Sequence, residues 1–296
     1  MQFKGTDVIM EGLLLDRILY LILLIMSDIL AIHDLSSYGK SSLSVVIPVL
    51  ESLGSECSSL PTALLSTQSD GFEPLYMQDL TNAMRSIFSM HKSLNLHFDA
   101  VYSGFLGSSE QIYTVEEIIK HYNTFTLVDP VLGDNGKLYQ TMEDNAVDNM
   151  RRLVHLASLI TPNYTEAGLL TGLEYSDSLS NHDIENLVGN MRTLGPESGV
   201  ITSVPIKMGL ANIAYDRDCH RVFMFADAGI SYPGSGDLFA SILLALIMKK
   251  MSFFAAVKTA TEIASYAISE SKRKDRERRR GVMLPPVFEE IKRRAL

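Results

Sequence analysis

The segment YPGSGDLFAS, residues 232–241, joins a glycine-rich turn to the start of an apolar run that is typical of a helix. A helix N-terminus exposes unpaired backbone N–H groups and the positive end of the helix dipole, so it attracts anions such as phosphate. Gly234, Ser235 and Gly236 would let such an anion approach the backbone closely. Asp237 is then either an ordinary helix cap or a base that takes the proton of an alcohol attacking a phosphoryl group.

Two further segments carry carboxylates that would suit a magnesium ion. VDPVLGDNGKLY (128–139) places Asp129 and Asp134 on one turn, and TPNYTEAGLL (161–170) places Glu166 in the first turn of a helix. Mg²⁺ often keeps its waters and takes few direct carboxylates, so carboxylates from two loops facing one space would suffice. Alternatively, Asp129 only precedes a proline turn, and Glu166 only complements a helix dipole.

The segment SSYGKSS (36–42) has part of a phosphate-binding P-loop pattern but does not complete it. A P-loop needs a glycine five residues before its Gly-Lys pair, and Asp34 stands at that position. A carboxylate there would repel the phosphates that such a loop holds. Asp34 lies at the end of the first expected strand, where it is either a turn residue or part of a site.

Short β-rich runs alternate with helical ones from residue 27 onward. Strands are expected at 28–34, 98–104, 124–130, 155–163 and 198–203, with two more around a polar turn within 210–226. Helices are expected at 40–54, 108–122 (starting with a capping box), 236–250 and 252–273. This alternation predicts one α/β domain whose mostly parallel sheet is covered on both faces. Its site would lie at the carboxyl ends of the strands.

The composition of the 296 residues fits a folded protein with a substantial core. Apolar residues make up 46% and charged residues 21%, and the formal net charge of −9 argues against nucleic-acid binding. The basic run KRKDRERRR (272–280) is interpreted as a solvated helix end. Cys57 and Cys219 have no metal-site spacing and suggest no disulfide framework, so a cytoplasmic location is expected.

The apolar N-terminal stretch, residues 12–26, is not typical of a membrane anchor. Asp16 and Arg17 interrupt it, and the uncharged part that remains is shorter than the roughly 20 residues of a membrane span. It also lacks the basic start and the cleavage site of a secretory signal. Residues 1–25 are therefore treated as an extension of uncertain status, and residues 26–296 as the single domain. No membrane partner is expected.

Four ordered motifs together resemble a known superfamily. GSGDLFASILLA, DPVLGDNGKLY, ITPNYTEAGLLTG and VITS resemble the ribokinase-like superfamily, and within it the pyridoxal (vitamin B6) kinases. ILAIHDLSSYGKSSL and LPTALLSTQSDGF (60–72) also look like the substrate-side loops of these kinases. The resemblance covers about residues 28–270. It implies a three-layer ribokinase-like fold and ATP-dependent phosphorylation of the 5′-hydroxymethyl group of pyridoxal, pyridoxine or pyridoxamine.

The resemblance also implies a role for individual residues. Asp237 matches the catalytic base, and Gly234, Ser235 and Gly236 match the anion hole. Asp129 and Glu166 match the carboxylates that organise Mg²⁺. The positions on the nucleotide side are Asp134, Thr161, Asn163, Thr202 and Ser203. The positions on the substrate side are Asp34, Thr62 and Phe105. The resemblance further suggests a homodimer.

Asp34 departs from the family pattern, because many B6 kinases have a serine that contacts the pyridine ring at this place. An ionised carboxylate would favour a protonated ring nitrogen. The related hydroxymethylpyrimidine kinases share much of the pattern and are the nearest alternative. A sugar kinase fits less well, since no inserted lid of strands is evident. A non-catalytic nucleotide-binding protein would be expected to have lost the base or the anion hole, and both are intact.

Overall fold

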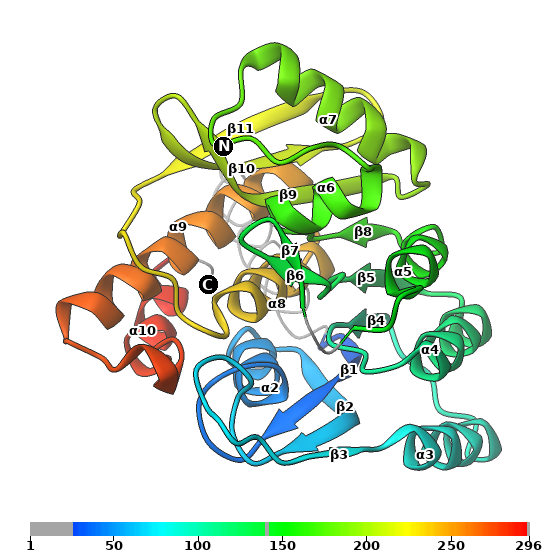
Figure 1. Cartoon of the computed structure of the whole chain (residues 1–296). Helices are drawn as coiled ribbons and strands as arrows, with labels where there is room; N and C mark the ends of the chain where they lie inside the picture. Colours follow the sequence, from blue (N-terminus) through cyan, green and yellow to red (C-terminus); the bar gives the residue numbers. More distant parts are fainter. Residues whose placement is uncertain (1–25, 140–141, 295–296) are drawn as a thin grey trace, which may run out of the picture.

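A nine-stranded, mostly parallel sheet forms the centre of the molecule (Figure 1), in a computed structural model that describes residues 26–139 and 142–294. The strand order is β11-β10-β9-β8-β5-β4-β1-β2-β3. Neighbouring strands from β2 to β9 pair in parallel, while β3, β10 and β11 run antiparallel to their neighbours. The strands are β1 Asp28–Ser36, β2 Glu56–Leu65, β3 Met77–Asp79, β4 Ala100–Ser103, β5 Phe125–Val128, β8 Leu159–Ile160, β9 Ser198–Ile206, β10 Gly209–Tyr215 and β11 His220–Phe225. A small hairpin pairs β6 (Gly133–Asp134) with β7 (Lys137–Leu138).

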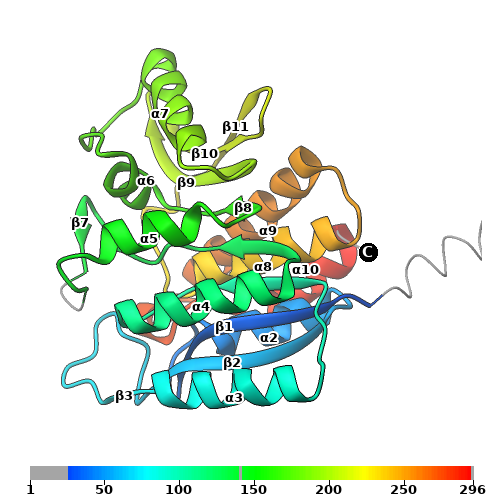
Figure 2. The same cartoon turned by 90° about the vertical axis from the view of Figure 1, so that its right-hand side faces the viewer.

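Helices cover both faces of this sheet, which confirms the predicted three-layer α/β fold (Figure 1; Figure 2). One layer contains α2 (Leu43–Ser52), α8 (Ser235–Met248), α9 (Phe253–Arg273) and α10 (Pro285–Arg294). The other contains α3 (Thr81–Ser93), α4 (Ser109–Tyr122), α5 (Ala146–Val154), α6 (Tyr164–Thr171) and α7 (Asn181–Thr193). The short 3₁₀ turn η1 (Arg278–Arg280) lies between α9 and α10.

Strand β1 explains why two separate cores form. Ile29, Leu30, Ala31 and Ile32 are all fully buried, as expected for a central parallel strand with helices on both faces. Successive side chains point to opposite faces of a strand. Ile29 and Ala31 accordingly pack in the core under α2, α8 and α9, while Leu30 and Ile32 pack in the core under α3 to α7.

The same packing holds α8 in place. Its residues Leu238–Leu246 are all buried, so the helix is apolar on every side, as expected for a helix that lies inside a domain. It packs between α9 and α2 over the sheet. This brings its N-terminal turn to the carboxyl ends of the parallel strands, where the sequence predicts the site.

Several predicted boundaries are corrected by the structure. The strand expected at 155–163 is only Leu159–Ile160, because His155 still belongs to the end of α5. The helix expected from residue 40 starts at Leu43. Ser108 caps α4 by accepting from the amide of Gln111, but the Gln111 side chain accepts from Gly107 instead of Ser108. The predicted capping box is therefore half formed, because Nε2 of Gln111 donates to Thr62 of β2 and to Asp79 of β3.

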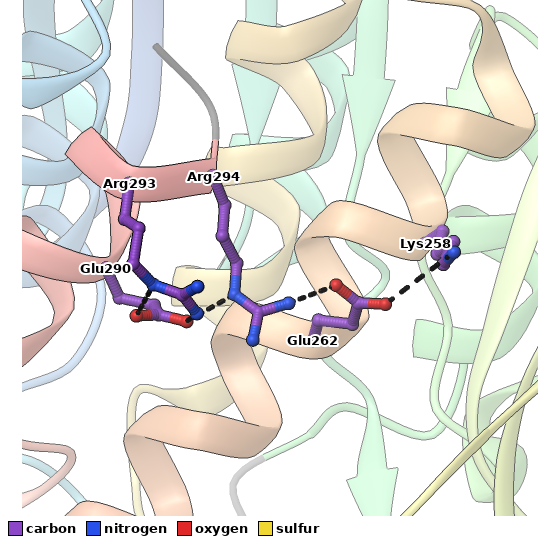
Figure 3. A network of polar contacts seen from close by, with 5 residues as sticks. All are labelled: Lys258, Glu262, Glu290, Arg293 and Arg294. Atoms are coloured by element: carbon purple, nitrogen blue, oxygen red, sulfur yellow. Dashed lines mark hydrogen bonds and ion pairs between the residues drawn. The ribbon is translucent and has the colours of Figure 1, made fainter.

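The C-terminal helix α10 is fixed to α9 by a network of charged side chains (Figure 3). Arg294 bridges Glu290 of α10 and Glu262 of α9, and Glu262 also lies 4.0 Å from Lys258. Underneath, Val287 and Ile291 are fully buried against the core. This packing places α10 in the same helix layer as α8.

No helix in residues 26–139 and 142–294 is both long and apolar enough to cross a membrane. The apolar stretch 12–25, and with it the assignment of 1–25 as an extension, lies outside the residues that the structure describes.

Candidate active site

The turn before α8 has a backbone that only glycine can readily adopt. Gly234 has φ of 80°, and a Cβ atom there would lie 2.4 Å from the carbonyl oxygen of Lys40. Gly236, two residues further on, is different, because a Cβ atom there would meet no protein atom within 4 Å. The space in front of Gly236 is therefore open to a ligand. Ser235 begins the helix, and its amide donates to Tyr232 within the turn.

Asp237 lies in the first turn of α8. One of its carboxylate oxygens accepts a hydrogen bond from a backbone amide, and the other lies near His33. Oδ2 accepts a hydrogen bond of 2.8 Å from the amide of Ser42. Oδ1 lies 3.8 Å from Nδ1 of His33, and the side chain is 14% exposed. Burial raises the pKa of Asp237 from 3.8 to about 6, and the nearby negative charge of Asp34 adds to this. A carboxylate with that pKa is suited to accept a proton near neutral pH.

No individual role was predicted for His33, which borders Asp237. It is fully buried, and among the described residues neither ring nitrogen has a hydrogen-bond partner. Burial lowers its pKa to about 3, so the ring is neutral. The ring contacts Tyr102 edge-on, and a Cβ atom at Gly104 would lie 2.2 Å from Nδ1. The feature of the sequence that pointed to this close contact was Gly104, which directly follows the buried strand β4.

Asp34 is buried next to Asp237, at an irregularity in the pairing of β1 with β2. Its Oδ1 accepts a hydrogen bond of 2.5 Å from the hydroxyl of Ser42, and its Oδ2 accepts one of 3.3 Å from Ser36. Each carboxylate oxygen of Asp34 therefore already accepts a hydrogen bond from a serine hydroxyl. The expected contact of Asp34 with a pyridine nitrogen stays a prediction.

Asp129, directly after β5, and Glu166, in the first turn of α6, lie close enough for their charges to interact. Burial raises the pKa of Asp129 well above its usual value, and the negative charges of Glu166 and Asp237 add to the shift. Burial also raises the pKa of Glu166 to about 8. The oxygens of Glu166 accept hydrogen bonds from the amides of Leu132 and Asn163, at 3.0 and 2.8 Å. Buried Asp129 and Glu166, together with the largely buried Asp237, place mutually repelling carboxylates near one another, which favours the presence of a cation.

The donor set fits Mg²⁺ and does not resemble a closed metal site. In the part of the chain that the structure describes, no three His, Cys, Asp or Glu side chains group to hold a metal ion. Mg²⁺ is usually bound through one or two carboxylates together with waters and substrate phosphates. Asp129 and Glu166 supply that number of carboxylates.

The predicted nucleotide-side residues lie at the end of β6, after β8 and along β9. Asn163 forms a capping box with Glu166 and donates through Nδ2 to the carbonyl of Gly133, so it ties α6 to the β6–β7 hairpin. Asp134 is exposed on that hairpin and accepts from Asn135. Thr161 is buried directly after β8.

Two more of the predicted nucleotide-side residues lie on β9. The amide of Thr202 donates to Pro162, which brings β9 beside the segment that follows β8. Ser203 is exposed and has φ of 57°, at an irregularity in the pairing of β9 with β10. Such bulges redirect side chains and occur often beside active sites.

On the substrate side, Thr62 and Phe105 contact each other. The hydroxyl of Thr62 donates to the carbonyl oxygen of Phe105 at 3.0 Å, and Thr62 is fully buried. This bond joins the end of β2 to the loop after β4. The structure thus places both residues at the predicted edge of the sheet, while their contact with a substrate stays a prediction.

The basic run departs from the interpretation as a solvated helix end. Helix α9 ends at Arg273, and the segment 276–281 folds back onto the loops that follow β1 and β2. Arg280 accepts from the amide of Lys40, and Arg279 accepts from Nε2 of buried Gln68. Arg278 pairs with Asp70 at 2.5 Å, although both side chains are largely exposed.

The sheet, its two helix layers and the glycine turn in front of a carboxylate define a phosphotransferase of the ribokinase-like fold. A profile of the phosphomethylpyrimidine kinase family matches residues 25–280. The chain belongs to this family of the ribokinase-like superfamily, on the branch that includes the pyridoxal kinases.

Solved structures and curated proteins agree with this assignment. A Bacteroides thetaiotaomicron protein assigned to the phosphomethylpyrimidine kinases is 34% identical, with a TM-score of 0.85 over 90% of this chain and 94% of that one. A second crystal form of that protein contains pyridoxal. Pyridoxal kinase from Lactobacillus plantarum is 29% identical, with a TM-score of 0.79 over 90% of this chain and 96% of that one. Pyridoxal kinase from Arabidopsis thaliana is 30% identical over 166 residues, a match that spans only half of either chain.

Proposed function

We propose that the protein transfers the γ-phosphoryl group of ATP to the 5′-hydroxymethyl group of pyridoxal, pyridoxine or pyridoxamine. The observation that carries the proposal is the position of Asp237. Its carboxylate lies in the first turn of α8, three residues after Gly234 and beside the open space in front of Gly236. The pyridoxal bound to the Bacteroides relative and the pyridoxal kinases among the similar proteins support a B6 vitamer as the acceptor.

The proposed chemistry assigns a separate task to each part of the site. Asp237 takes the proton of the 5′-hydroxyl while the hydroxyl oxygen attacks the γ-phosphorus of ATP. The bond between that phosphorus and its bridging oxygen breaks, and ADP leaves. The turn of Gly234, Ser235 and Gly236 at the start of α8 is proposed to form the anion hole that stabilises the charge on the transferred phosphoryl group.

Mg²⁺ is proposed as the cofactor of ATP, with Asp129 and Glu166 as the residues that would hold it and its waters. Such an ion neutralises charge on the phosphates. Asp134, Thr161, Asn163, Thr202 and Ser203 are proposed to form the nucleotide side. Thr62 and Phe105 are proposed to form the vitamer side.

A homodimer and a cytoplasmic location are also part of the proposal. Leu35 and Leu64 are register partners on β1 and β2, and each is 38% exposed. Tyr76 and Met77 are exposed at the neighbouring edge strand. Exposed apolar side chains that gather at one place favour a protein contact. Both cysteines of the described residues are free, which suits a reducing compartment.

The test is a substrate screen on the purified full chain. ATP and MgCl₂ are supplied with each of the three vitamers or with hydroxymethylpyrimidine, and both ADP and the phosphorylated product are measured. We expect ADP formation only when a vitamer is present. Preference for hydroxymethylpyrimidine would instead support the kinase activity of thiamine metabolism. Nucleotide binding without any transfer would support a non-catalytic protein. Light scattering at several protein concentrations tests the dimer.

A further inference from the structure

Ser42 has a backbone conformation that serine rarely adopts. Its φ is 49° and its ψ is −134°, a region in which the Cβ atom crowds the neighbouring backbone and which glycine usually occupies. Residues held in such conformations persist only when their surroundings fix them, and they cluster at active sites. Ser42 is buried, with 8% of its surface exposed.

Two hydrogen bonds of Ser42 account for this conformation. Its amide donates to Oδ2 of Asp237 at 2.8 Å, and its hydroxyl donates to Oδ1 of Asp34. Ser42 occupies the N-cap position of α2, where a serine hydroxyl normally accepts from the helix backbone, but it makes no such capping bond. The side chain is therefore directed to Asp34, and the amide to Asp237.

We infer that Ser42 is a positioning residue for the carboxylate of Asp237, and that Asp34 anchors Ser42 in its unusual conformation. This inference rests on the proposed kinase function. The amide of Ser42 occupies Oδ2 of Asp237, which leaves Oδ1 to take the proton of the attacking hydroxyl. Neither proton nor charge passes through Ser42, whose task is geometric.

The groups around Asp237 make the orientation of its carboxylate important. Neutral His33 and buried Asp34 face it from β1. Tyr102 of β4 and Asp129 after β5 are close enough to interact with its charge. The Ser42 amide is the one hydrogen-bond donor from another residue that the described structure directs at this carboxylate. Losing it would leave the base free to turn.

The decisive comparison is Ser42→Gly against Ser42→Ala. Both variants remove the hydroxyl and keep the amide, so they differ only in backbone preference. Glycine adopts the observed φ and ψ readily, whereas alanine without its anchor should relax and move the amide away from Asp237. We expect kcat of Ser42→Ala to lie about tenfold or more below that of Ser42→Gly, with the KM values for vitamer and ATP similar in the two.

The pH profile of kcat gives a readout that a general loss of packing would not move. A hydrogen bond to a carboxylate favours its charged form, so losing the amide should raise the pKa of Asp237. The acidic limb of the profile should therefore lie at higher pH in Ser42→Ala than in Ser42→Gly. Ser52→Ala, at the other end of α2, is the control and should retain wild-type kcat and profile.

Asp34 provides a second comparison that does not depend on the folding of Ser42→Ala. Asp34→Asn keeps an oxygen that can accept from Ser42, whereas Asp34→Ala does not. We expect kcat of Asp34→Ala to be lower than that of Asp34→Asn, and the difference to shrink when Ser42→Gly is also present. If both Asp34 variants changed only the KM for the vitamer, Asp34 would be a ring contact and not an anchor.

Two outcomes separate the inference from the proposed function. If the wild-type chain phosphorylates none of the vitamers, the proposed function fails before any variant is compared. If the wild-type chain is active and folded Ser42→Gly and Ser42→Ala have equal kcat and equal pH profiles, the positioning role is wrong while the kinase remains.

Discussion

Nδ1 of His33 lies 3.8 Å from Oδ1 of Asp237, in a largely buried space where no opposite charge from the described part of the chain pairs with either group. Burial shifts both groups towards their neutral forms, lowering the pKa of His33 to about 3 and raising that of Asp237 to about 6. The pair is therefore a neutral imidazole beside a carboxylate that ionises just below neutral pH. This predicts how the activity depends on pH.

We expect kcat to fall as the pH drops through about 6, because protonated Asp237 cannot accept the proton of the hydroxyl.

Protonation of Asp237 has the opposite effect on stability, because it raises the free energy of unfolding. Its pKa is higher in the folded than in the unfolded chain, so its contribution to the free energy of unfolding is largest below about 4 and is lost as the pH rises through about 6. Circular dichroism at each pH should therefore show a folded protein where activity has already declined. Unfolding that coincides with the loss of kcat would contradict this assignment.

Asp237→Asn keeps the shape of the base and removes its ability to take a proton. We expect kcat to fall about 10²-fold or more, with the KM for ATP little changed, because positioned general bases contribute 10²–10⁴-fold. The amide oxygen can still accept from Ser42, so the variant should be at least as stable as the wild type at pH 8. A nearly normal kcat would reduce Asp237 to a helix cap.

Asp129→Asn and Glu166→Gln should both raise the Mg²⁺ concentration needed for half-maximal rate, but they should differ in stability. Both oxygens of Glu166 accept from backbone amides, and glutamine can satisfy only one of them. We expect Glu166→Gln to lose about 1–3 kcal/mol of unfolding free energy. Asp129→Asn removes a buried charge and should not lose stability. Kinetics over a Mg²⁺ series and urea unfolding measure the two effects. An unchanged Mg²⁺ dependence with a raised KM for the vitamer would refute the metal role.

Gly234→Ala and Gly236→Ala form a matched pair in one turn. Gly234 has positive φ and no room for a Cβ atom, so its replacement should lower both stability and kcat. At Gly236 a Cβ atom meets no protein atom, and alanine favours helix by up to about 1 kcal/mol. Gly236→Ala should therefore have an unchanged or higher Tm but lower activity, because its methyl group enters the space proposed for the phosphoryl group. Full activity in Gly236→Ala would move the anion site elsewhere.

Gln68→Ala should loosen the loop around residue 70. Gln68 is buried, and its side chain bonds to Asp70 and to the carbonyl of Arg279. Hydrogen exchange of residues 66–72 and 276–281 should rise in this variant. Arg278→Ala removes only the exposed pair with Asp70, and such pairs contribute about 0–1 kcal/mol, so it serves as the control. Equal exchange in both variants would show that Gln68 does not tie the two segments.

Elements with a strong local pattern were predictable from the sequence. The apolar β1, the apolar α8 with its glycine turn, and the long α9 are confirmed at nearly the expected bounds. Strand β2 was not predicted, because Pro61 and its serines mask a strand that is specified by pairing with β1 on one side. Helix α3 was missed as well, because its polar surface hides the few buried residues.

The site residues whose side-chain type carries the chemistry could be predicted from the sequence. The residues that act through contacts between distant parts of the chain could not. Asp129, Glu166 and Asp237 could be expected to meet, since each follows or faces the carboxyl end of a strand. The bond from Ser42 to Asp237 spans 195 positions and depends on a main-chain amide, which any residue type except proline carries. No pattern in the sequence reports such a contact. The unpartnered ring of His33 is likewise visible only when burial is known.

The return of segment 276–281 to the site has a consequence for the growing chain on the ribosome. Val282 donates to Pro233 directly before the glycine turn, and Arg280 accepts from Lys40, which touches the same turn. The turn and the loop after β1 are thus both completed by residues 280 and 282, which are synthesised after all strands of the sheet and after α9. A nascent protein can assemble its sheet before these residues emerge from the ribosome, yet the glycine turn cannot acquire their support until they do. Binding of phosphate compounds at the turn, as proposed, should therefore begin only after residue 282 has emerged.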